Sequence, residues 1–224
     1  MILCPARTSS HRRPVTIALV AALLAVARTS SRGADLPAAK PAGTPAVAKP
    51  ACRCEAPAGR NRYTTEVVTY RMPDVDLLDM DGARVPLASV FDGEGPLVVQ
   101  FIFTTCPTIC GPLSAGVSTL QGSPGDDLAT ARFVSISIDP EHDRPEQLRR
   151  YAKSFGAGPR WQFYTGSRES IVAVQKAFDA YQANKMGHQP LTFLRPRPGA
   201  SWVRLAGIPG AADLKAECRR MLRP

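Results

Sequence analysis

The sequence contains only three histidines in 224 residues: His11, His142 and His188. A site that needs imidazole therefore has few candidates. The six cysteines do not form the two short, paired spacings that are typical of zinc sites, which weakens a zinc-binding interpretation. The chain also shows no internal repeat and no sign of a second folded domain.

A long hydrophobic run is also missing at the N-terminus. The apolar stretch Val15–Ala27 has 13 residues, whereas a membrane-spanning helix needs about 17–25. It follows Arg7, Arg12 and Arg13, and it ends in the small-residue cleavage pattern Ala-Val-Ala. We therefore expect residues 1–27 to be a signal peptide. An N-terminal membrane anchor and a mitochondrial transit sequence remain alternatives, and each of the three implies export across a membrane.

Excess charge is absent from the part of the chain that is expected to fold. The formal net charge is +9, but residues 1–65 hold ten Lys and Arg against two acids, whereas residues 66–224 hold 18 against 17. Nucleic-acid binding needs a basic face on the folded part, so composition gives no support for such a partner. Residues 28–62 are rich in Ala, Pro and Lys and predict a disordered linker. The folded domain is expected over residues 63–224.

The stretch Pro96–Leu113, PLVVQFIFTTCPTICGPL, organises that domain. Its apolar run Leu97–Phe103 predicts a buried central strand, paired in parallel. A helix is expected over Cys106–Gln121, with Pro107 in its first turn, where a missing N–H costs nothing. Cys106 and Cys110 would then share one helical face at the carboxyl edge of the sheet, where ligands of α/β folds gather.

This cysteine pair has several interpretations. Two thiolates at that spacing can bind one soft metal ion or approach disulfide geometry. The helix N-terminus should make both Cys106 and Cys110 ionise more easily than free cysteine. The alternative is a pair of ordinary core cysteines.

The remaining pattern alternates strands with helices and closes with a hairpin and a helix, which predicts an α/β sandwich with an N-terminal β-hairpin. The hairpin turn is expected at Asp81-Gly82, and Ser167 is expected to cap a helix. The expected strands are Glu66–Tyr70, Val75–Met80, Arg132–Ile138, Trp161–Tyr164, Leu191–Leu194 and Trp202–Leu205, and the other expected helices are Arg144–Phe155, Ser167–Tyr181 and Ala211–Leu222.

Three separated segments resemble one known family. FIFTTCPTIC, then SISIDPEHDRPEQLRRYAKSFG at Ser135–Gly156, then KMGHQPLTFL at Lys185–Leu194, are similar to the Sco/SenC copper chaperones, over about Tyr70 to Leu222. One departure is visible, because Gly111 intervenes between the second cysteine and the proline that usually follows it directly. The resemblance implies a thioredoxin-like fold with a central mixed sheet, and copper as the bound metal.

The resemblance also implies the ligands. His188 matches the third copper ligand of the family, beside Cys106 and Cys110. Thiolates suit Cu(I), and imidazole suits copper in either oxidation state. Asp139 has two interpretations, a carboxylate that orients a ligand or a cap of the turn at Pro140, and the second is slightly favoured. His142 is expected to be a solvated loop residue.

Two functions follow from this reading. The first is a metal-handling protein rather than an enzyme, which passes copper to another protein. The resemblance alone implies that the acceptor is a respiratory cytochrome c oxidase copper centre, with another copper acceptor or other copper carriers as further partners. The second is a thiol-disulfide oxidoreductase, although that motif usually has two residues between its cysteines. A structural disulfide would close too small a loop to stabilise much. The expected location is the periplasm, or the inner membrane facing it, or the mitochondrial intermembrane space in a eukaryote.

The other cysteines fit no single role. Cys52-Arg53-Cys54, within the expected linker, can carry copper or a disulfide, or be an incidental pair. Cys218 lies on the expected last helix and is most simply a buried thiol.

Overall fold

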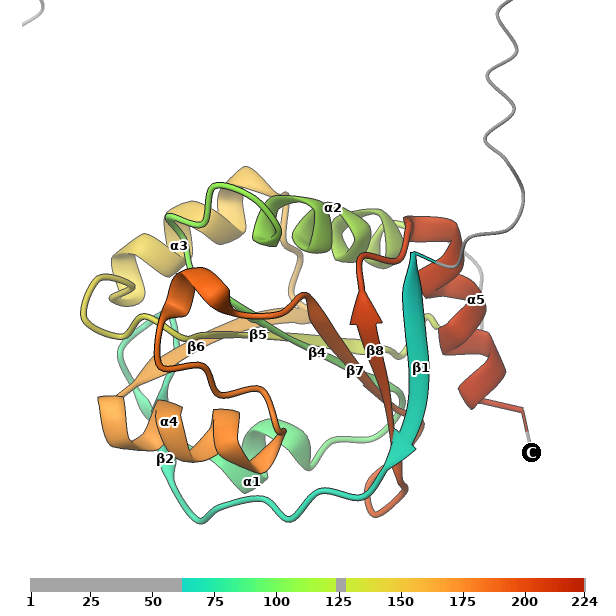
Figure 1. Cartoon of the computed structure of the whole chain (residues 1–224), viewed down its shortest axis with the longest axis horizontal. Coiled ribbons are helices and arrows are strands. Elements are labelled where there is room, and N and C mark those ends of the chain that lie inside the picture. The colour runs from blue at the N-terminus through green and yellow to red at the C-terminus, as the bar shows by residue number, and fades with distance from the viewer. Residues whose placement is uncertain (1–61, 124–127, 224) are drawn as a thin grey trace, which may run out of the picture. The chain divides into compact units, whose positions relative to one another are not determined.

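An eight-stranded mixed sheet organises the computed structural model, which describes residues 62–123 and 128–223 (Figure 1). The strand order is β1-β8-β7-β4-β5-β6-β2-β3. The strands are β1 Tyr63–Val68, β2 Asp76–Leu78, β3 Arg84–Pro86, β4 Leu97–Ile102, β5 Arg132–Ser137, β6 Trp161–Gly166, β7 Leu191–Arg195 and β8 Trp202–Gly207. The helices are α1 Leu87–Phe91, α2 Cys110–Gln121, α3 Pro145–Ser154, α4 Arg168–Ala177, α5 Ala211–Met221 and the short 3₁₀ helix η1 Lys185–Gly187.

Strand β4 lies at the centre of this sheet, as its apolar run predicts. All six of its residues are buried. It pairs in parallel with β5 and antiparallel with β7, so the expected parallel pairing holds on one side only. Because side chains alternate along a strand, Leu97, Val99 and Phe101 belong to one core cluster and Val98 and Ile102 to another.

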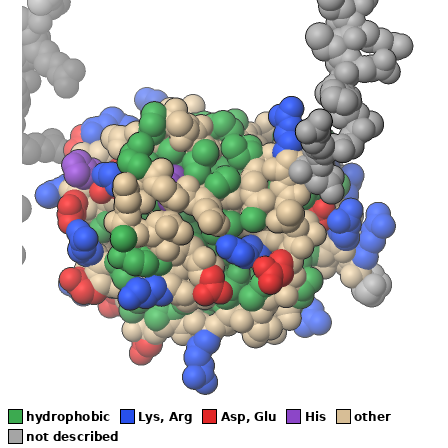
Figure 2. Space-filling view, viewed as in Figure 1, with side chains coloured by type: hydrophobic (Ala, Val, Ile, Leu, Met, Phe, Trp, Pro, Cys, Tyr) green, Lys and Arg blue, Asp and Glu red, His purple; other side chains and the backbone are tan. Residues whose placement is uncertain are grey.

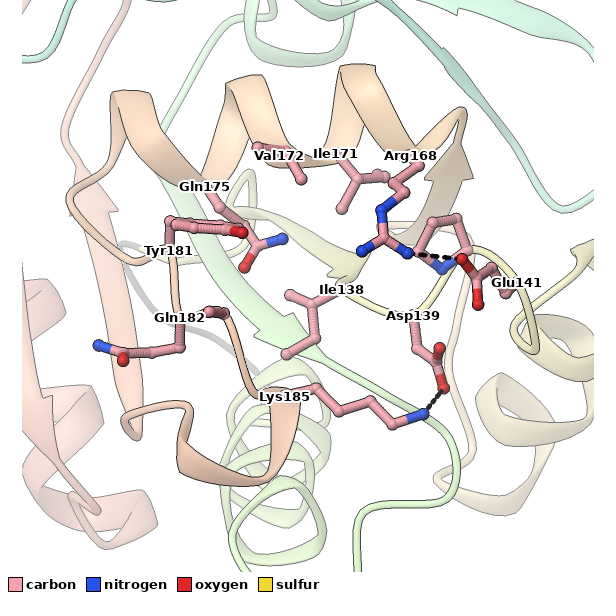
Figure 3. Close-up of a pocket in the computed structure, with 12 residues that line it drawn as sticks. Ile138, Asp139, Glu141, Arg168, Ile171, Val172, Gln175, Tyr181, Gln182 and Lys185 are labelled. Atoms are coloured by element: carbon pink, nitrogen blue, oxygen red, sulfur yellow. Dashed lines mark hydrogen bonds and ion pairs between the residues drawn. The ribbon is translucent and has the colours of Figure 1, made fainter.

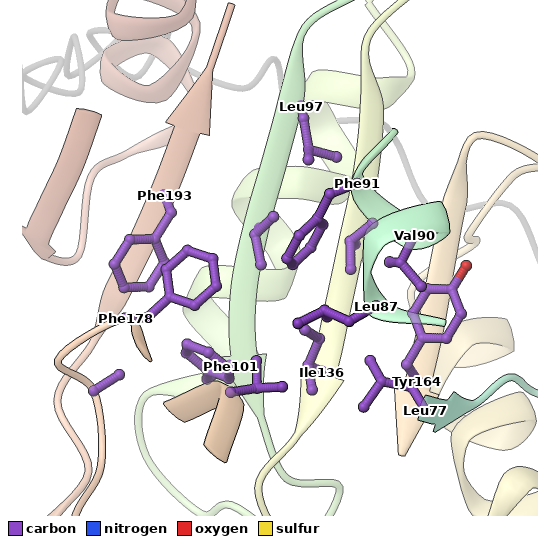
Figure 4. Close-up of a cluster of buried hydrophobic side chains, with 14 of the residues drawn as sticks. Leu77, Leu87, Val90, Phe91, Leu97, Phe101, Ile136, Tyr164, Phe178 and Phe193 are labelled. Carbon is purple, nitrogen blue, oxygen red and sulfur yellow. The ribbon is translucent and has the colours of Figure 1, made fainter. Parts of the chain in front are cut away.

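Helices cover both faces of the sheet and form these two cores. Helices α1 and α4 lie on one face, and α2, α3 and α5 lie on the other. Figure 4 shows the first core, where Phe91 from α1 and Phe178, directly after α4, pack with Phe101 and Phe193 from the strands. Burial on both faces fixes the register of β4, and therefore fixes where the chain leaves the carboxyl end of that strand.

The predicted N-terminal hairpin is confirmed as β2 and β3, although β2 is shorter than the expected strand Val75–Met80. Gly82 takes a positive φ of 83° in its turn, and the Asp79 carboxylate accepts the N–H groups of Asp81 and Ala83. Strand β2 then pairs with β6, which places the hairpin at the end of the sheet opposite β1.

The helices differ from the expectation at their ends. Ser167 caps α4 as predicted, since its side chain accepts the Ser170 N–H. The helix ends at Ala177 instead of continuing to Tyr181, because Asp179 takes a left-handed φ of 52°. Helix α1 was not predicted, because a five-residue helix is too short to show a periodic pattern.

Surface charge on the described domain is mixed. Figure 2 shows Lys and Arg side chains interspersed with Asp and Glu on one face. None of the helices in residues 62–123 and 128–223 is long and apolar enough to cross a membrane. The expected leader, the expected linker and the Cys52-Arg53-Cys54 pair lie outside the described residues.

Candidate metal centre

The loop after strand β4 carries Cys106, and the buried carboxylate of Asp143 fixes the conformation of this loop. Beyond Ile102, the backbone N–H of Thr104 donates to Asp143 Oδ2 at 2.9 Å and its hydroxyl donates to Oδ1 at 2.5 Å. Ser137 Oγ, at the end of β5, donates to the same carboxylate at 2.6 Å. Asp143 is fully buried. The chain therefore leaves the sheet edge along a fixed path toward Cys106.

Cys106 lies outside α2, which corrects the expectation that both cysteines share one helical turn. Residues 104–109 form turns, and the helix begins at Cys110, so Pro107 is not in its first turn. The physical reason is that Cys106 Sγ accepts the backbone N–H of Cys110 at 3.4 Å. The sulfur thus occupies the place of a capping oxygen, since Ile109 at the N-cap makes no side-chain hydrogen bond.

The capping position has an electrostatic consequence for Cys106. Burial acts to raise the pKa of this half-buried thiol, but it is outweighed by hydrogen bonds from the Cys110 thiol and from the backbone N–H groups of Thr108, Cys110 and Ile109, so the pKa is lowered. This agrees with the expected effect of a helix N-terminus on a thiol.

Cys110 behaves in the opposite way, so the prediction that both thiols ionise easily is wrong for this residue. Cys110 is only 1% exposed. Burial raises its pKa, and its hydrogen bond with the Cys106 sulfur raises it further. The centre therefore combines one thiol that ionises readily with one that stays protonated in the metal-free, reduced protein.

His188 approaches from the loop between α4 and β7. Its Nδ1 lies 3.0 Å from the carbonyl oxygen of Lys185. Because a carbonyl only accepts hydrogen bonds, Nδ1 carries the proton and Nε2 presents its lone pair. Nε2 lies 3.6 Å from Cys110 Sγ. The ring also packs edge-on against Phe103, at 5.2 Å between centroids.

The structure brings together the three predicted ligand residues. One sulfur each from Cys106 and Cys110 and one ring nitrogen of His188 all lie within 4.8 Å of one another. His188 is 8% exposed, and burial lowers its pKa, opposed by the hydrogen bond to Lys185. A neutral imidazole and two sulfurs form a donor set that suits a soft metal ion.

Asp139 does not join these ligand atoms but contacts the loop that carries the imidazole. Its Oδ2 lies 2.5 Å from Lys185 Nζ, and Lys185 in turn accepts hydrogen bonds from both the ring and the backbone N–H of His188. The backbone carbonyl of Asp139 also accepts the N–H groups of His142 and Asp143 in the turn after Pro140. The Asp139 carboxylate thus contacts the loop that carries His188, and its role stays a prediction.

The other predicted residues lie where expected. His142 has an exposed side chain, which contacts Asp139 Oδ1 at 3.2 Å. Cys218 is fully buried on α5, as predicted, and is separate from the group of ligand atoms.

Sequence reasoning missed two residues of the site. Asp143 was not singled out, although an acid beside Asp139 in a loop after a buried strand is a signal for backbone capping. Tyr151 lies within the expected helix Arg144–Phe155 and was not singled out, but its hydroxyl lies 2.8 Å from Ser114 Oγ and 3.3 Å from the carbonyl oxygen of Cys110. The Tyr151 hydroxyl therefore holds the first turn of α2 in place through the Cys110 carbonyl.

An eight-stranded mixed sheet with helices on both faces is the architecture of a thioredoxin-like protein, and here two thiols and one imidazole meet at the carboxyl end of its central strand β4. The SCO1/SenC family model matches residues 70–199. The chain therefore belongs to the SCO1/SenC family.

Individual relatives agree with this assignment. The chain is 36% identical to the SCO1 protein homolog of Bacillus subtilis over 106 residues, which is 47% of this chain and 54% of the relative. Over 138 residues it is 34% identical to the mitochondrial SCO2 homolog of Bos taurus. These residues are 58% of this chain and 50% of the relative. The chain thus spans about half the length of these curated relatives.

Comparison with solved structures confirms that this chain has the thioredoxin-like fold of Sco proteins. A SCO1/SenC family lipoprotein from Bacillus anthracis superposes with a TM-score of 0.60 at 24% identity, over 70% of this chain and 98% of that one. BsSco, described as a member of the Sco family of cytochrome c oxidase assembly proteins, superposes with a TM-score of 0.56 at 27% identity. The superposition covers 70% of this chain and 96% of BsSco. Copper-bound ScoI from Bradyrhizobium japonicum superposes with a TM-score of 0.55 at 25% identity. The superposition covers 67% of this chain and 99% of ScoI.

Proposed function

We propose that the protein binds one copper ion as cargo through Cys106, Cys110 and His188. The observation that carries this proposal is the convergence of two sulfurs and a neutral imidazole nitrogen within 4.8 Å. Thiolates favour Cu(I), and imidazole allows Cu(II) to be held as well. The copper-bound ScoI structure supports the same metal for this chain.

Delivery of the metal is the second part of the proposal. Three protein ligands leave room for a ligand from a partner, which a transfer step requires. The acceptor is proposed to be a cytochrome c oxidase copper centre, in line with the description of BsSco. We propose an exported protein, periplasmic or anchored in the inner membrane, or in the mitochondrial intermembrane space, with residues 1–27 as leader or anchor and residues 28–62 as linker.

The test is an anaerobic Cu(I) titration of the reduced protein against a competing chelator. We expect one tightly bound copper per chain. Cys106→Ser and Cys110→Ser should each abolish tight binding, because one thiolate does not hold Cu(I) against competing thiols. Cys218→Ser is the matched control, because this buried thiol lies outside the centre. Full affinity in either of the first two variants would refute the site.

A thiol-disulfide oxidoreductase is the second candidate, and one observation favours it. Cys106 is half-buried with a lowered pKa, and it hydrogen-bonds to the neighbouring thiol, as an attacking thiol requires. His188→Ala separates the two functions. A copper carrier should lose Cu(II) strongly and Cu(I) partly, whereas the disulfide chemistry of Cys106 and Cys110 should persist. Unchanged binding of both copper states would place the oxidoreductase first.

A further inference from the structure

Asp143 is a buried acid beside the candidate metal centre that has no cation to balance it. It is 0% exposed, and none of the described Lys, Arg and His side chains forms an ion pair with it. Figure 3 shows that nearby carboxylates differ in this respect, since Asp139 meets Lys185. Glu141 likewise meets Arg168. Because charged groups are rarely buried unless they are paired or bind a metal, the missing partner of Asp143 calls for an explanation.

The hydrogen bonds of Asp143 are those of an ionised carboxylate. Its Oδ2 accepts both the Thr104 N–H and the Ser137 hydroxyl, and its Oδ1 accepts the Thr104 hydroxyl. The hydroxyl contacts, at 2.5 and 2.6 Å, have the length of about 2.5–2.7 Å that is typical of bonds to a charged oxygen. Hydrogen bonds donated to a carboxylate favour its charged form. Asp143 therefore carries a negative charge into the interior.

This charge lies next to the ligand atoms without being one of them. Thr104, which binds the carboxylate, directly follows Phe103, and the Phe103 carbonyl oxygen accepts the Cys106 N–H at 3.1 Å. Burial raises the pKa of Cys110, the hydrogen bond with the Cys106 sulfur raises it further, and the charge of Asp143 acts in the same direction. Asp143 does not belong to the group of ligand atoms that lie within 4.8 Å of one another. It therefore acts on the centre through its field and not by coordination.

A metal ion at the centre would supply the missing positive charge. Two thiolates and the Asp143 carboxylate bring three negative charges, and the imidazole of His188 is neutral when it binds a metal. Cu(I) leaves two of the three charges unbalanced, whereas Cu(II) leaves only one. Because electrostatic interactions are strong in a protein interior, the Asp143 charge stabilises Cu(II) more than Cu(I). Soft thiolates favour Cu(I), so the carboxylate opposes their preference.

We propose that Asp143 is a buried counter-charge of the copper site, which raises the affinity for Cu(II) relative to the affinity for Cu(I). The inference rests on the proposed function for the identity of the metal. This role is separate from the hydrogen bonds by which Asp143 fixes the loop at Thr104. A disturbed loop weakens the binding of both copper states, whereas a lost charge changes the ratio between them.

The experiment measures Cu(I) and Cu(II) affinities of the full-length protein by anaerobic competition with a chelator for each ion. Asp143→Asn removes the charge and keeps the shape of the side chain. One unit charge at about 10 Å in a protein interior changes an equilibrium by about tenfold, so the ratio of Cu(I) to Cu(II) affinity should rise about tenfold in this variant. The potential of the bound copper should become more positive by about 59 mV, which is that factor for a one-electron couple. Asp143→Ser, which is also neutral, serves if the asparagine variant does not fold.

Two control variants separate charge from structure. Thr104→Val removes one hydrogen bond to Asp143 but keeps the charge, so it should leave the affinity ratio unchanged. Glu217→Gln neutralises another buried acid, which is 5% exposed on α5, is paired with Arg220 and lies outside the ligand group, and it should also leave the ratio unchanged.

The outcomes distinguish this inference from the proposed function. An unchanged or lowered affinity ratio in Asp143→Asn would overturn the inference, even if both affinities fall, because an equal loss reports only the disturbed loop. A parent protein that binds no copper would refute the proposed function itself, and the inference with it. A raised ratio in Asp143→Asn, with both controls unchanged, would support the role of the charge.

Discussion

The loop that carries Cys106 and the loop that carries His188 meet at one edge of the sheet, but different bonds hold them there. The first is anchored by Asp143, a fully buried carboxylate that accepts three hydrogen bonds from Thr104 and Ser137. The second is anchored by Lys185, whose side chain is 37% exposed where it meets Asp139. Solvent weakens such pairs, so the thiol side of the centre is the more firmly fixed.

Removal of Asp143 should therefore have the largest effect. Asp143→Ala leaves the Thr104 N–H and the two hydroxyl groups without a buried acceptor. We expect a loss of about 3 kcal/mol in the free energy of unfolding, measured by urea denaturation. Asp143→Asn keeps the shape and part of the hydrogen bonding and should cost less. A loss below about 1 kcal/mol for the alanine variant would contradict the difference between the two anchors.

A second prediction compares the reactivity of Cys106 and Cys110, the two thiols on the more firmly fixed side of the centre. Cys106 is half-buried with a lowered pKa, whereas burial raises the pKa of Cys110 and raises that of Cys218 to about 12. Because the thiolate is the nucleophile, iodoacetamide should modify Cys106 before Cys110 and Cys218, by at least about tenfold in rate. The lowered pKa means that this rate should persist at a pH where free cysteine has become protonated. Mass spectrometry of quenched samples gives the order, and equal rates would refute it.

The smallest effect is expected on the imidazole side. Lys185→Met removes the ammonium but keeps most of the stem, and the backbone carbonyl that accepts from His188 remains. A partly exposed ion pair contributes about 1 kcal/mol or less, so Cu(II) affinity should fall by about fivefold, measured by chelator competition. His142→Ala is the control and should leave affinity unchanged, because its side chain is 66% exposed. A loss of about a hundredfold with Lys185→Met would show that this anchor is as firm as the other.

The strands of the sheet could be predicted from the sequence because they follow simple rules. A seven-residue apolar run forms a strand buried on both faces, and Asp-Gly forms a hairpin turn. His188 was located by resemblance rather than by periodicity, since a single histidine in a loop has no pattern of its own. The structure adds the contact between its Nε2 and Cys110.

The start of α2 was not readable, because a cysteine is not among the residues expected to cap a helix. The pattern of Cys106 and Cys110 at i and i+4 fits a continued helix equally well. Asp143 and Tyr151 were missed for a related reason. Most of their partners, such as the Thr104 N–H and the Cys110 carbonyl, lie far away in sequence, and only the packed fold brings these groups together.

The sulfur of Cys106 is bonded to the backbone of α2 as well as being part of the candidate metal centre, because it accepts a hydrogen bond from the Cys110 N–H at the start of that helix. Any event that draws on the electrons of that sulfur, whether oxidation, alkylation or metal binding, also changes the environment of the amide protons that donate to it, that of Cys110 among them. The nitrogen and proton resonances of Cys110 are thus a natural spectroscopic gauge of the chemical state of its neighbour. Apart from 15N enrichment, no probe has to be attached to the protein to follow that state in time.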